Sequence, residues 1–525
     1  MPNNAGVSGN AYKWEVLIVV MIGTLMASLD QSIVNVSLPD IMADFGAPVN
    51  DIEWVITGYM LAFATLMPLT AWLREHIGYK RLFVISLFVF TLGSLLCAMA
   101  WNLPSLVVAR VIQALGGGAI TPTGMAMIAD VFEPSERGKA IGYWGVGVIV
   151  GPSFGPTLGG YLTNAFGWRS IFTVNLPVGI VAILLALALL REDKPSEHSH
   201  KHPFDLWGFL FLSTFLVSFL LALSQGEDKG WSSAYIYTCW ALAFTGFVGF
   251  TVVESLTPHG IMDIRLLKSP IYAACMLVVS ARSLALFGGV FLLPLFLQQV
   301  MGFNEIDSGL ILLPGSLMIA LVMPFAGKLS DKIGPLWPSL IGLLGIAYFM
   351  WTYRTLDINT SIWDVIEPTL IRGVAIALLI TPVMVTALNC IPKEKAGMAS
   401  AMMNLTQQVA GSVGIGLLGA ILNHRMVFHQ GLAASAWNAL TPASQAAMGQ
   451  VAGRLHDLGL SHFDSMRGSG AVVAGHIFKM ISVSAFEDAF LVGAAIVLFA
   501  LIPAFFLPAK NVLKPGKPES IAVLD

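Results

Sequence analysis

Charged residues are scarce in this chain of 525 residues. Asp, Glu, Lys and Arg make up 11% of it, whereas 56% of the residues are hydrophobic. A soluble domain carries about 25% charged residues. So little charge cannot cover a surface that faces water, and the mean hydropathy of +0.77 agrees with this. The composition therefore excludes an ordinary soluble protein and predicts an integral membrane protein.

Cysteine is also rare, and the four cysteines lie far apart, in or at the ends of apolar segments. This spacing forms no metal or redox motif, so we interpret them as small hydrophobic residues. His198, His200 and His202 alternate with other residues in the stretch 191–204. Weak metal affinity is compatible with that pattern, but a solvated linker between two spans explains it better. We expect no metal site and no cofactor.

Nucleotide-binding and catalytic motifs are missing as well. The chain contains no Gly-x-x-x-x-Gly-Lys-Ser/Thr phosphate loop, no His-Glu-x-x-His motif and no stretch that reads as a soluble catalytic domain. We therefore expect neither an enzyme nor an ATP-driven pump, unless a separate subunit hydrolyses ATP. The first apolar run is too long for a cleavable signal peptide, and no small-residue cleavage site follows it.

Long apolar runs dominate the chain instead. About 20 apolar residues span the hydrocarbon core of a bilayer, and a span in lipid must satisfy its own backbone hydrogen bonds as a helix. We count fourteen such runs, near 15–36, 52–73, 81–100, 104–126, 138–161, 169–190, 205–224, 234–255, 270–298, 307–326, 334–352, 364–388, 397–424 and 486–508. The predicted fold is an all-α polytopic membrane protein with fourteen transmembrane helices.

Positive charge is distributed unevenly between the segments that join these runs. With the N-terminus in the cytoplasm, the inner side holds most of the 28 lysines and arginines, while the short outer segments 37–51, 101–103 and 299–306 hold none. Positively charged segments stay on the cytoplasmic side of a membrane. The pattern predicts an even number of spans, both termini in the cytoplasm, and a multi-pass protein of the cell inner (plasma) membrane.

Two stretches of the chain repeat each other. Residues 71–81 and 327–335 share the order small residue, Leu, acidic residue, basic residue, Gly. Arg110 and Arg372 lie at similar depths in runs four and twelve. Internal repeats of this kind are typical of secondary transporters. We predict an N-terminal six-helix bundle at 1–190, a linker with two inserted helices at 191–264, and a C-terminal six-helix bundle at 265–525 that includes an external loop at 425–485.

Five short segments, at 29–39, 71–81, 110–113, 147–160 and 167–177, carry a family resemblance. In this order they resemble the major facilitator superfamily and, within it, the fourteen-span drug:proton antiporters of the EmrB/QacA type. The resemblance covers nearly the whole chain. The long outer loop before the last span resembles EmrB in particular, whose relatives work with a periplasmic adaptor and an outer-membrane channel.

The resemblance implies a proton-coupled multidrug efflux transporter. Such a protein exports hydrophobic or amphipathic toxic compounds by alternating access and draws on the proton gradient rather than on a cofactor. It also implies that the protein is the inner-membrane component of a tripartite system. The implied partners are a periplasmic adaptor, an outer-membrane channel, membrane lipid and small amphipathic substrates, and no nucleic acid is expected among them. The alternative is a major facilitator exporter or importer of one specific metabolite.

Three polar residues in apolar runs are predicted to couple transport to protons. Asp30 lies in the first run, and a carboxylate in lipid is costly enough to be a functional candidate by default. Arg110 and Gln113 lie one helical turn apart in run four, and an intramembrane arginine needs an internal partner. The resemblance links Asp30 to proton coupling. A purely structural pair between Asp30 and Arg110 remains the alternative.

Two further motifs are expected to control conformation. The fifth run has a glycine on one helix face at every fourth position, and two prolines that kink the helix: Gly147, Gly151, Pro152, Gly155, Pro156 and Gly159. We expect this bent helix to pack closely at the interface of the two halves, with ordinary bundle packing as the alternative. The repeated stretch is expected to latch neighbouring helix ends through Glu75, Gly78, Lys80, Arg81 and, in the second half, Asp331.

Polar or aromatic residues inside apolar runs are candidates for substrate contact: Gln31, Asn35, Trp54, Tyr59, Phe291, Gln298, Asn404 and Gln407. Arg282, near the middle of run nine, either contacts an anionic substrate or pairs with a carboxylate that the sequence does not identify. Arg372 is the weaker echo of Arg110, and Glu367 is a possible partner for it.

Overall fold

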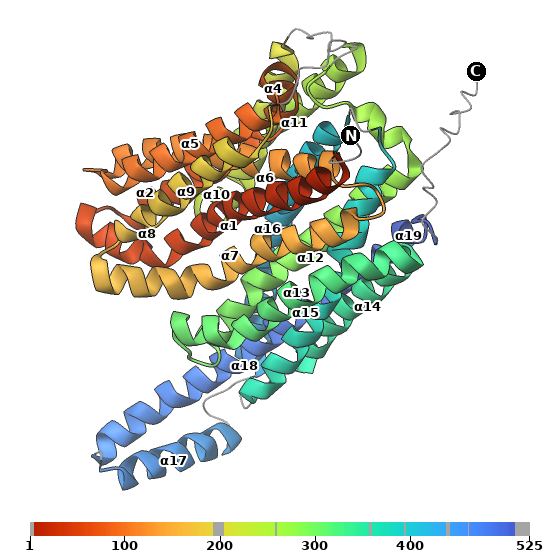
Figure 1. Ribbon diagram of the computed structural model, residues 1–525. Helices are drawn as coiled ribbons and strands as arrows, with labels where there is room; N and C mark the ends of the chain where they lie inside the picture. Colours follow the sequence, from red (N-terminus) through yellow and green to blue (C-terminus); the bar gives the residue numbers. More distant parts are fainter. Residues whose placement is uncertain are drawn as a thin grey trace.

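The computed structural model describes residues 5–192, 204–257, 260–355, 357, 360–392, 395–436, 442–459 and 461–509. All regular secondary structure within these ranges is helical (Figure 1). Twelve of the described helices are long and apolar enough to cross a membrane, and one bent pair of helices makes a thirteenth candidate span. The prediction of an all-α polytopic membrane protein is confirmed. The count of fourteen spans and the location of the termini stay predictions. His198, His200 and His202 lie outside the described residues.

The N-terminal part of the chain contains nine helices within the described residues: α1 (Ala5–Phe45), α2 (Val49–Ile52), α3 (Trp54–Leu66), α4 (Leu69–Ile77), α5 (Tyr79–Ala98), α6 (Leu103–Val131), α7 (Arg137–Phe166), α8 (Ser170–Thr173) and α9 (Asn175–Leu189). Helices α3 and α4 form the bent pair, with an angle of 55° between them. Pro68 stands in the break, where it cannot donate a helical hydrogen bond. Helix α7 is 30 residues long but is not among the thirteen candidate spans.

Helices α10 (Leu206–Lys229) and α11 (Ala234–Leu256) occupy the stretch predicted to hold two inserted helices, and a short 3-10 turn, η1 (Ile264–Lys268), follows them. The remaining helices are α12 (Pro270–Gln299), α13 (Glu305–Ile333), α14 (Leu336–Thr352), α15 (Ile362–Asn389), α16 (Ala396–Ala436), α17 (Pro442–Asp457), α18 (His462–Phe499) and α19 (Leu501–Ala504), with the turn η2 (Tyr353–Thr355) after α14. In Figure 1, α1, α5, α7 and α9 lie together in one bundle, and α13, α14, α15 and α18 lie in another. Helix α10 touches α3 and α16, one helix from each bundle.

The two helices that carry the echoed arginines start in the same way. Asn102 precedes α6 and accepts a hydrogen bond from the Ser105 backbone, while the Ser105 hydroxyl accepts one from the Asn102 backbone. Ser361 and Asp364 form the same reciprocal pair at the start of α15. Such a capping box satisfies two N–H groups that a helix start leaves unpaired. Both helices are therefore capped at their N-terminal ends by local side chains.

Most of the stretch 425–485, predicted to be an external loop, is helical, and its external location stays a prediction. Helix α16 continues to Ala436, α18 begins at His462, and α17 lies between them against α18. At 41 residues, α16 is about 60 Å long, roughly twice the ~30 Å core of a bilayer. Hydropathy falls where these helices leave the membrane, but helix propensity does not, since Ala, Gln, Met and Leu remain frequent. Figure 1 shows α17 and the start of α18 projecting beyond the other helices.

Candidate functional site

A fully buried polar cluster surrounds Asp30 in the middle of α1. Asp30 has no exposed surface, and Arg110 from α6 is 1% exposed. The Arg110 Nη1 group donates to Asp30 Oδ2 at 2.6 Å, which makes an ion pair inside the bundle. Removing one partner of a buried pair leaves an uncompensated charge, which is far more costly than losing a surface pair. The two helices are therefore held together at this point by charge.

Two amide side chains complete the coordination of the Asp30 carboxylate. Gln113 Nε2 donates to Asp30 Oδ1 at 2.8 Å, and Asn175 Nδ2 from α9 donates to the same oxygen at 2.9 Å. Both amides also donate to Ser94 Oγ on α5, at 2.7 Å and 3.3 Å respectively. Gln113 Oε1 in turn accepts from Arg110 Nη1 at 2.6 Å. Side chains of α6 and α9 thus donate to the carboxylate of α1, and Ser94 of α5 joins the network through the two amides. A connected network of this kind is strong because its members polarise one another.

The guanidinium of Arg110 is enclosed by aromatic rings. It lies 4.0 Å from the centre of the Tyr59 ring and 5.7 Å from that of Phe172. A cation over an aromatic face is stabilised by the ring quadrupole. Tyr59 is only 2% exposed, so its ring serves this cluster inside the N-terminal bundle. Substrate contact by Tyr59 stays a prediction, and in this structure the ring packs on Arg110 instead.

The structure brings Asp30, Arg110 and Gln113 together, as expected for residues that need internal partners. Sequence reasoning missed Asn175 and Ser94 as members of the cluster. Asn175 belongs to the segment 167–177 that contributed to the family resemblance, so a signal existed for it. Ser94 gives no such signal, because a serine in an apolar run more often donates to its own helix.

Arg282 on α12 has polar but uncharged partners. It is 2% exposed, and its Nη2 donates to Gln407 Oε1 at 2.8 Å and to Ser283 Oγ at 3.3 Å. Its Nε has no hydrogen-bond partner among the described residues. The expected pairing with a carboxylate is therefore wrong, and Gln407 is placed as an arginine partner. A role for Arg282 toward an anionic substrate stays a prediction.

Arg372 on α15 differs from its echo in the first half. It is 6% exposed and lies 5.1 Å from the centre of the Phe349 ring. Its Nε has no hydrogen-bond partner, and no ion pair forms with it in the described part of the chain. Glu367 instead lines a separate polar pocket of about 320 Å³ together with Asp364 and Thr360. The suggested pair between Arg372 and Glu367 is wrong.

The glycine stripe of α7 packs against α1, within the same half of the molecule. A side chain added at Gly151 would meet Leu29 N at 2.6 Å, and one at Gly159 would meet Ile33 O at 2.8 Å. Gly147 and Gly155 approach other backbone and side-chain atoms of α1. Close packing is therefore confirmed, and α7 does lie at the interface of the two halves because it also packs against α13, but the glycine stripe itself faces α1. Four-residue spacing identifies a contact face and does not say which helix it meets. Pro152 and Pro156 lie inside α7, which the structure describes as one continuous helix.

The contact between the halves lies closer to the start of α7, against α13. A Cβ at Gly138 would stand 2.5 Å from Asp331 Oδ1, and one at Gly142 would stand 2.8 Å from Met323 O. Asp331 accepts hydrogen bonds from the backbone N–H groups of Gly138 and Lys139. A carboxylate at the first turn of a helix satisfies unpaired N–H groups and complements the helix dipole. Asp331 therefore joins the two halves at the end of the bundle predicted to be cytoplasmic.

Residues 71–81, the first copy of the repeated stretch, contact a neighbouring helix end through one of the predicted latch residues. Gly78 separates α4 from α5 with φ of +80°, a conformation that glycine adopts without strain. Lys80 Nζ donates to the Leu187 carbonyl near the end of α9 at 2.9 Å, so it contacts a neighbouring helix end as expected. For Glu75 and Arg81 the latch role stays a prediction.

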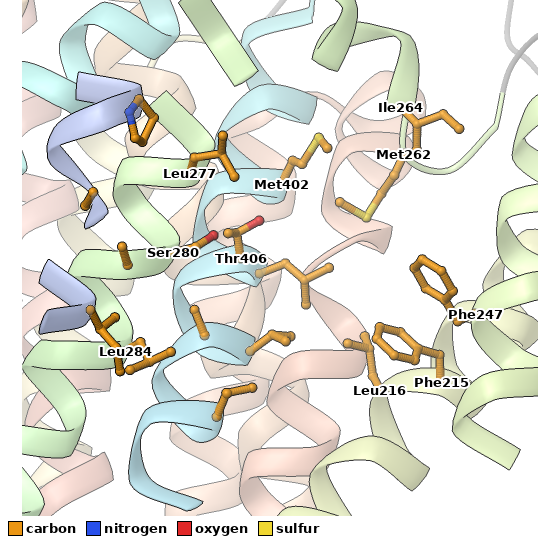
Figure 2. Close-up of a pocket in the computed structure, with 18 of the residues that line it drawn as sticks. Phe215, Leu216, Phe247, Met262, Ile264, Leu277, Ser280, Leu284, Met402 and Thr406 are labelled. Atoms are coloured by element: carbon orange, nitrogen blue, oxygen red, sulfur yellow. The ribbon is translucent and has the colours of Figure 1, made fainter. Parts of the chain in front are cut away.

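The remaining substrate candidates fall into two groups. Gln31 and Asn35 are exposed one turn apart on α1, and Trp54 is 38% exposed. Asn404 is buried and donates to the Ser400 carbonyl at 2.9 Å, while Phe291 and Gln298 are half-buried. None of these candidates lines the large apolar cavity of about 800 Å³ beside the inserted helices (Figure 2). Contact with substrate stays a prediction for the exposed residues.

Further contacts fix the ends of the helices. Arg137 donates to Asn389 Oδ1 at 2.6 Å and thereby joins α7 to α15. Asp488 on α18 accepts from Arg425 at 2.6 Å and lies 2.8 Å from His429 Nε2, which ties it to α16. Across the described residues, no three His, Cys, Asp or Glu side chains are arranged to hold a metal ion.

The chain matches the sequence profile of the Major Facilitator Superfamily over residues 20–415. It is 33% identical to the Multidrug resistance protein B homolog of Mycobacterium tuberculosis (strain ATCC 25618 / H37Rv) over 497 residues, which are 94% of this chain and 89% of that protein. It is 31% identical to the Multidrug export protein EmrB of Haemophilus influenzae over 432 residues, 82% of this chain and 84% of that protein.

A solved structure of the proton:xylose symporter XylE superposes with a TM-score of 0.60 at 14% identity, covering 95% of this chain and 97% of that one. At this identity the match speaks for the fold alone. The profile match covers well over half of the chain, and the relatives extend over most of it. The protein is a multi-pass membrane transporter that belongs to the major facilitator superfamily.

Proposed function

We propose that this protein is a proton-coupled exporter of hydrophobic and amphipathic toxic compounds. The observation that carries the proposal is the buried cluster at Asp30, an acid held in the middle of a membrane helix by Arg110, Gln113 and Asn175. Acids inside membrane spans mark proton or substrate pathways by default, because burying them is costly. Similarity to proteins named as multidrug exporters supports the outward direction and the substrate class.

Proton uptake at Asp30 would act directly on the contacts of α1 with α6 and α9. A neutral carboxyl group loses its charge attraction to Arg110 and gains an O–H that none of the three surrounding N–H donors can accept. Protonation therefore weakens the contacts that join α1 to α6 and α9. The group can then favour one arrangement of the bundle when charged and another when neutral, which is what exchange of a proton for a substrate requires.

The contacts between the halves suggest how access alternates in this proposal. Three contacts join the halves toward the end predicted to face the cytoplasm. They pair Asp331 with Gly138, Arg137 with Asn389, and the Ser400 hydroxyl with the Pro122 carbonyl. These contacts must break for a compound to enter from that side. A rocking motion of the two halves around a central site would exchange them for contacts at the other end.

A drug-susceptibility panel tests the export function. Cells that express the chain should tolerate lipophilic cations, dyes and fatty acids better than cells without it, and everted vesicles should accumulate those compounds when acidified inside. Unchanged tolerance together with uptake of one metabolite would instead identify a transporter for a specific metabolite.

We further propose that the helical hairpin α16–α18 docks a periplasmic adaptor of a tripartite system that also includes an outer-membrane channel. The hairpin extends well beyond the span length, and the Asp488 contacts with Arg425 and His429 brace its base. Deleting 436–470 should leave transport in vesicles intact while whole-cell resistance with a co-expressed adaptor is lost. Equal loss in both assays would contradict a docking role.

A further inference from the structure

A cavity of about 800 Å³ lies beside α10 and α11, the two helices predicted to be inserted between the six-helix halves. Its walls come from α10 and α11 on one side and from α12, α16 and α18–α19 on the other. A pocket of this volume is within the range that holds drug-sized molecules. Its lining is almost entirely apolar and includes Phe215, Phe247, Met262 and Met402 (Figure 2). Aromatic and Met side chains adapt to apolar ligands of varied shape.

Two hydroxyl groups interrupt this apolar lining, one from each of two facing helices. Ser280 Oγ on α12 already donates to the Met276 carbonyl at 2.9 Å, which leaves its oxygen free to accept. Thr406 on α16 makes no hydrogen bond within the described residues, although it lines the cavity. Figure 2 shows both hydroxyl oxygens among the apolar side chains. An unpaired hydroxyl in an apolar wall is costly unless a ligand or water pairs with it.

The cavity faces the lipid rather than the water. Leu277, Phe247 and Phe499 line it and are 59%, 51% and 72% exposed, so their surfaces meet the acyl chains of the bilayer. Along α12 the lining runs from Leu277 to Leu284, about 10 to 21 Å from the start of the helix. With that start on the cytoplasmic side, as predicted, the cavity opens within the inner leaflet.

The buried pair of Arg282 and Gln407 lies directly behind one wall of the cavity. Ala281 on α12 and Thr406 on α16 line the cavity, and the next residue in each helix is Arg282 or Gln407. These two side chains are hydrogen-bonded to each other, and Arg282 Nε remains without a partner in the described chain. A rotation of either helix would therefore bring polar groups to the cavity wall.

We propose that this cavity is a binding site for a lipophilic compound that carries a neutral hydroxyl group, taken from the inner leaflet by the inserted helices. The inference rests on the proposed export function and names its substrate class. Thr406 and Ser280 together offer one donor and one acceptor to the ligand's hydroxyl. The apolar body of the ligand fills the space between α10, α11 and α12.

A membrane phospholipid fits the cavity less well than such a compound. A phospholipid keeps its polar group at the membrane surface and would bring only acyl carbons to the wall near Thr406. That arrangement leaves the Thr406 hydroxyl unpaired, whereas a hydroxylated ligand satisfies it. The two occupants can be separated with photoreactive probes.

The test uses the full-length protein in nanodiscs with three diazirine probes: an alkylphenol, its methyl ether and a phosphatidylcholine. We expect the alkylphenol to label peptides of α10, α12 and α16, and unlabelled alkylphenol to displace it. The ether should label these peptides about fivefold less, because it cannot donate a hydrogen bond. Equal labelling by phosphatidylcholine that alkylphenol does not displace would overturn the proposal, as would no labelling by alkylphenol.

Three variants and one matched control locate the site. Ala410→Phe and Ala281→Phe fill the cavity from different helices and should abolish alkylphenol labelling, while Thr406→Val keeps the shape and should weaken it about fivefold. Ala241→Phe makes the same change at an exposed position of α11 outside the cavity and should leave labelling unchanged. Unaltered labelling in folded Thr406→Val and Ala410→Phe would overturn the proposal.

Transport assays separate this site from the export function itself. We expect wild-type vesicles to export the alkylphenol and Ala410→Phe vesicles not to export it, while both still export a lipophilic cation. That result would show that the cavity serves hydroxylated lipophilic compounds. Export of the alkylphenol at wild-type rate by Ala410→Phe would overturn the cavity proposal and leave the exporter intact. Absence of all export by the wild type would instead overturn the proposed function.

Discussion

Two buried arginines occupy echoed positions in the two halves and have opposite surroundings. Arg110 pairs with Asp30 at 2.6 Å and stacks on Tyr59, while Arg372 contacts the Phe349 ring and forms no ion pair within the described residues. Both helices begin with the same capping box, so the backbone framework is repeated. Each half thus has the arginine on a similarly capped helix, but within the described residues only Arg110 has an acidic partner.

In the proposed mechanism, this difference places the proton-sensitive element in the first half. A buried cation without an acid cannot exchange a proton for a substrate, since arginine stays protonated in proteins. Arg372 is therefore expected to fix packing in α14 and α15, whereas the Asp30 cluster can change with protonation. The second half contributes Asp331 at the contact between the halves instead.

The largest expected effect is that of Arg110→Met set against Arg372→Met. Removing Arg110 leaves the buried Asp30 carboxyl group without its cation, which should lower the free energy of unfolding by about 3–5 kcal/mol. Removing Arg372 relieves an unpaired buried cation, so stability should be unchanged or higher. Thermal unfolding of the purified variants measures both changes.

A double variant provides the control for this experiment. Asp30→Asn in the Arg110→Met background removes the stranded charge and should recover most of the lost stability, which double-mutant analysis expresses as a coupling energy. Equal losses in Arg110→Met and Arg372→Met would contradict the assigned difference between the halves.

A smaller effect is expected where the halves meet. Gly138→Ala places a methyl group 2.5 Å from Asp331 Oδ1 and 2.7 Å from the Gly327 carbonyl, so this contact must open. Overpacking of this kind costs about 1–3 kcal/mol. We expect slower transport and greater accessibility to a cysteine reagent on the cytoplasmic side. Gly453→Ala on the exposed part of α17 meets no atom within 4 Å and is the matched control.

The smallest effect concerns two buried serines on α5 and α14. Ser94 accepts from Gln113 and Asn175, so Ser94→Ala should cost about 1 kcal/mol. Ser339 is also buried, but its hydroxyl has no partner in the described part of the chain, so Ser339→Ala should be neutral or stabilising. The melting temperatures of the two variants measure this difference in stability. A larger loss of stability for Ser339→Ala than for Ser94→Ala would contradict the difference between the halves.

Much of the fold and part of the site could be predicted from sequence, for physical reasons. Polar residues are so costly in lipid that Asp30, Arg110 and Gln113 stand out and must find one another. Hydropathy likewise predicts the candidate spans, with the exception of the glycine- and proline-rich α7. Which helix a face contacts depends on three-dimensional packing, so four-residue spacing alone does not predict that the glycine stripe of α7 faces α1. The same limit applies to Arg372, whose lack of an acidic partner is set by its neighbouring helices.

The lengths of α16 and α18 also could not be predicted from hydropathy. Hydropathy marks where α16 and α18 leave the membrane, but it carries no information on whether a helix ends there. Asn175 and Ser94 were missed because single polar residues near helix ends or in apolar runs usually satisfy local backbone groups. The large cavity could not be predicted, since it depends on how α10 and α11 lie against α12 and α16.

Drug-induced proton release from purified protein is the most direct test of the central claim, that Asp30 exchanges its proton when substrate binds. Wild-type protein and Asp40→Asn, a change at an exposed acid ten residues along the same helix, should release protons when substrate is added. Asp30→Asn should bind substrate, remain folded and release none. Proton release by Asp30→Asn equal to that of the wild type would contradict the account.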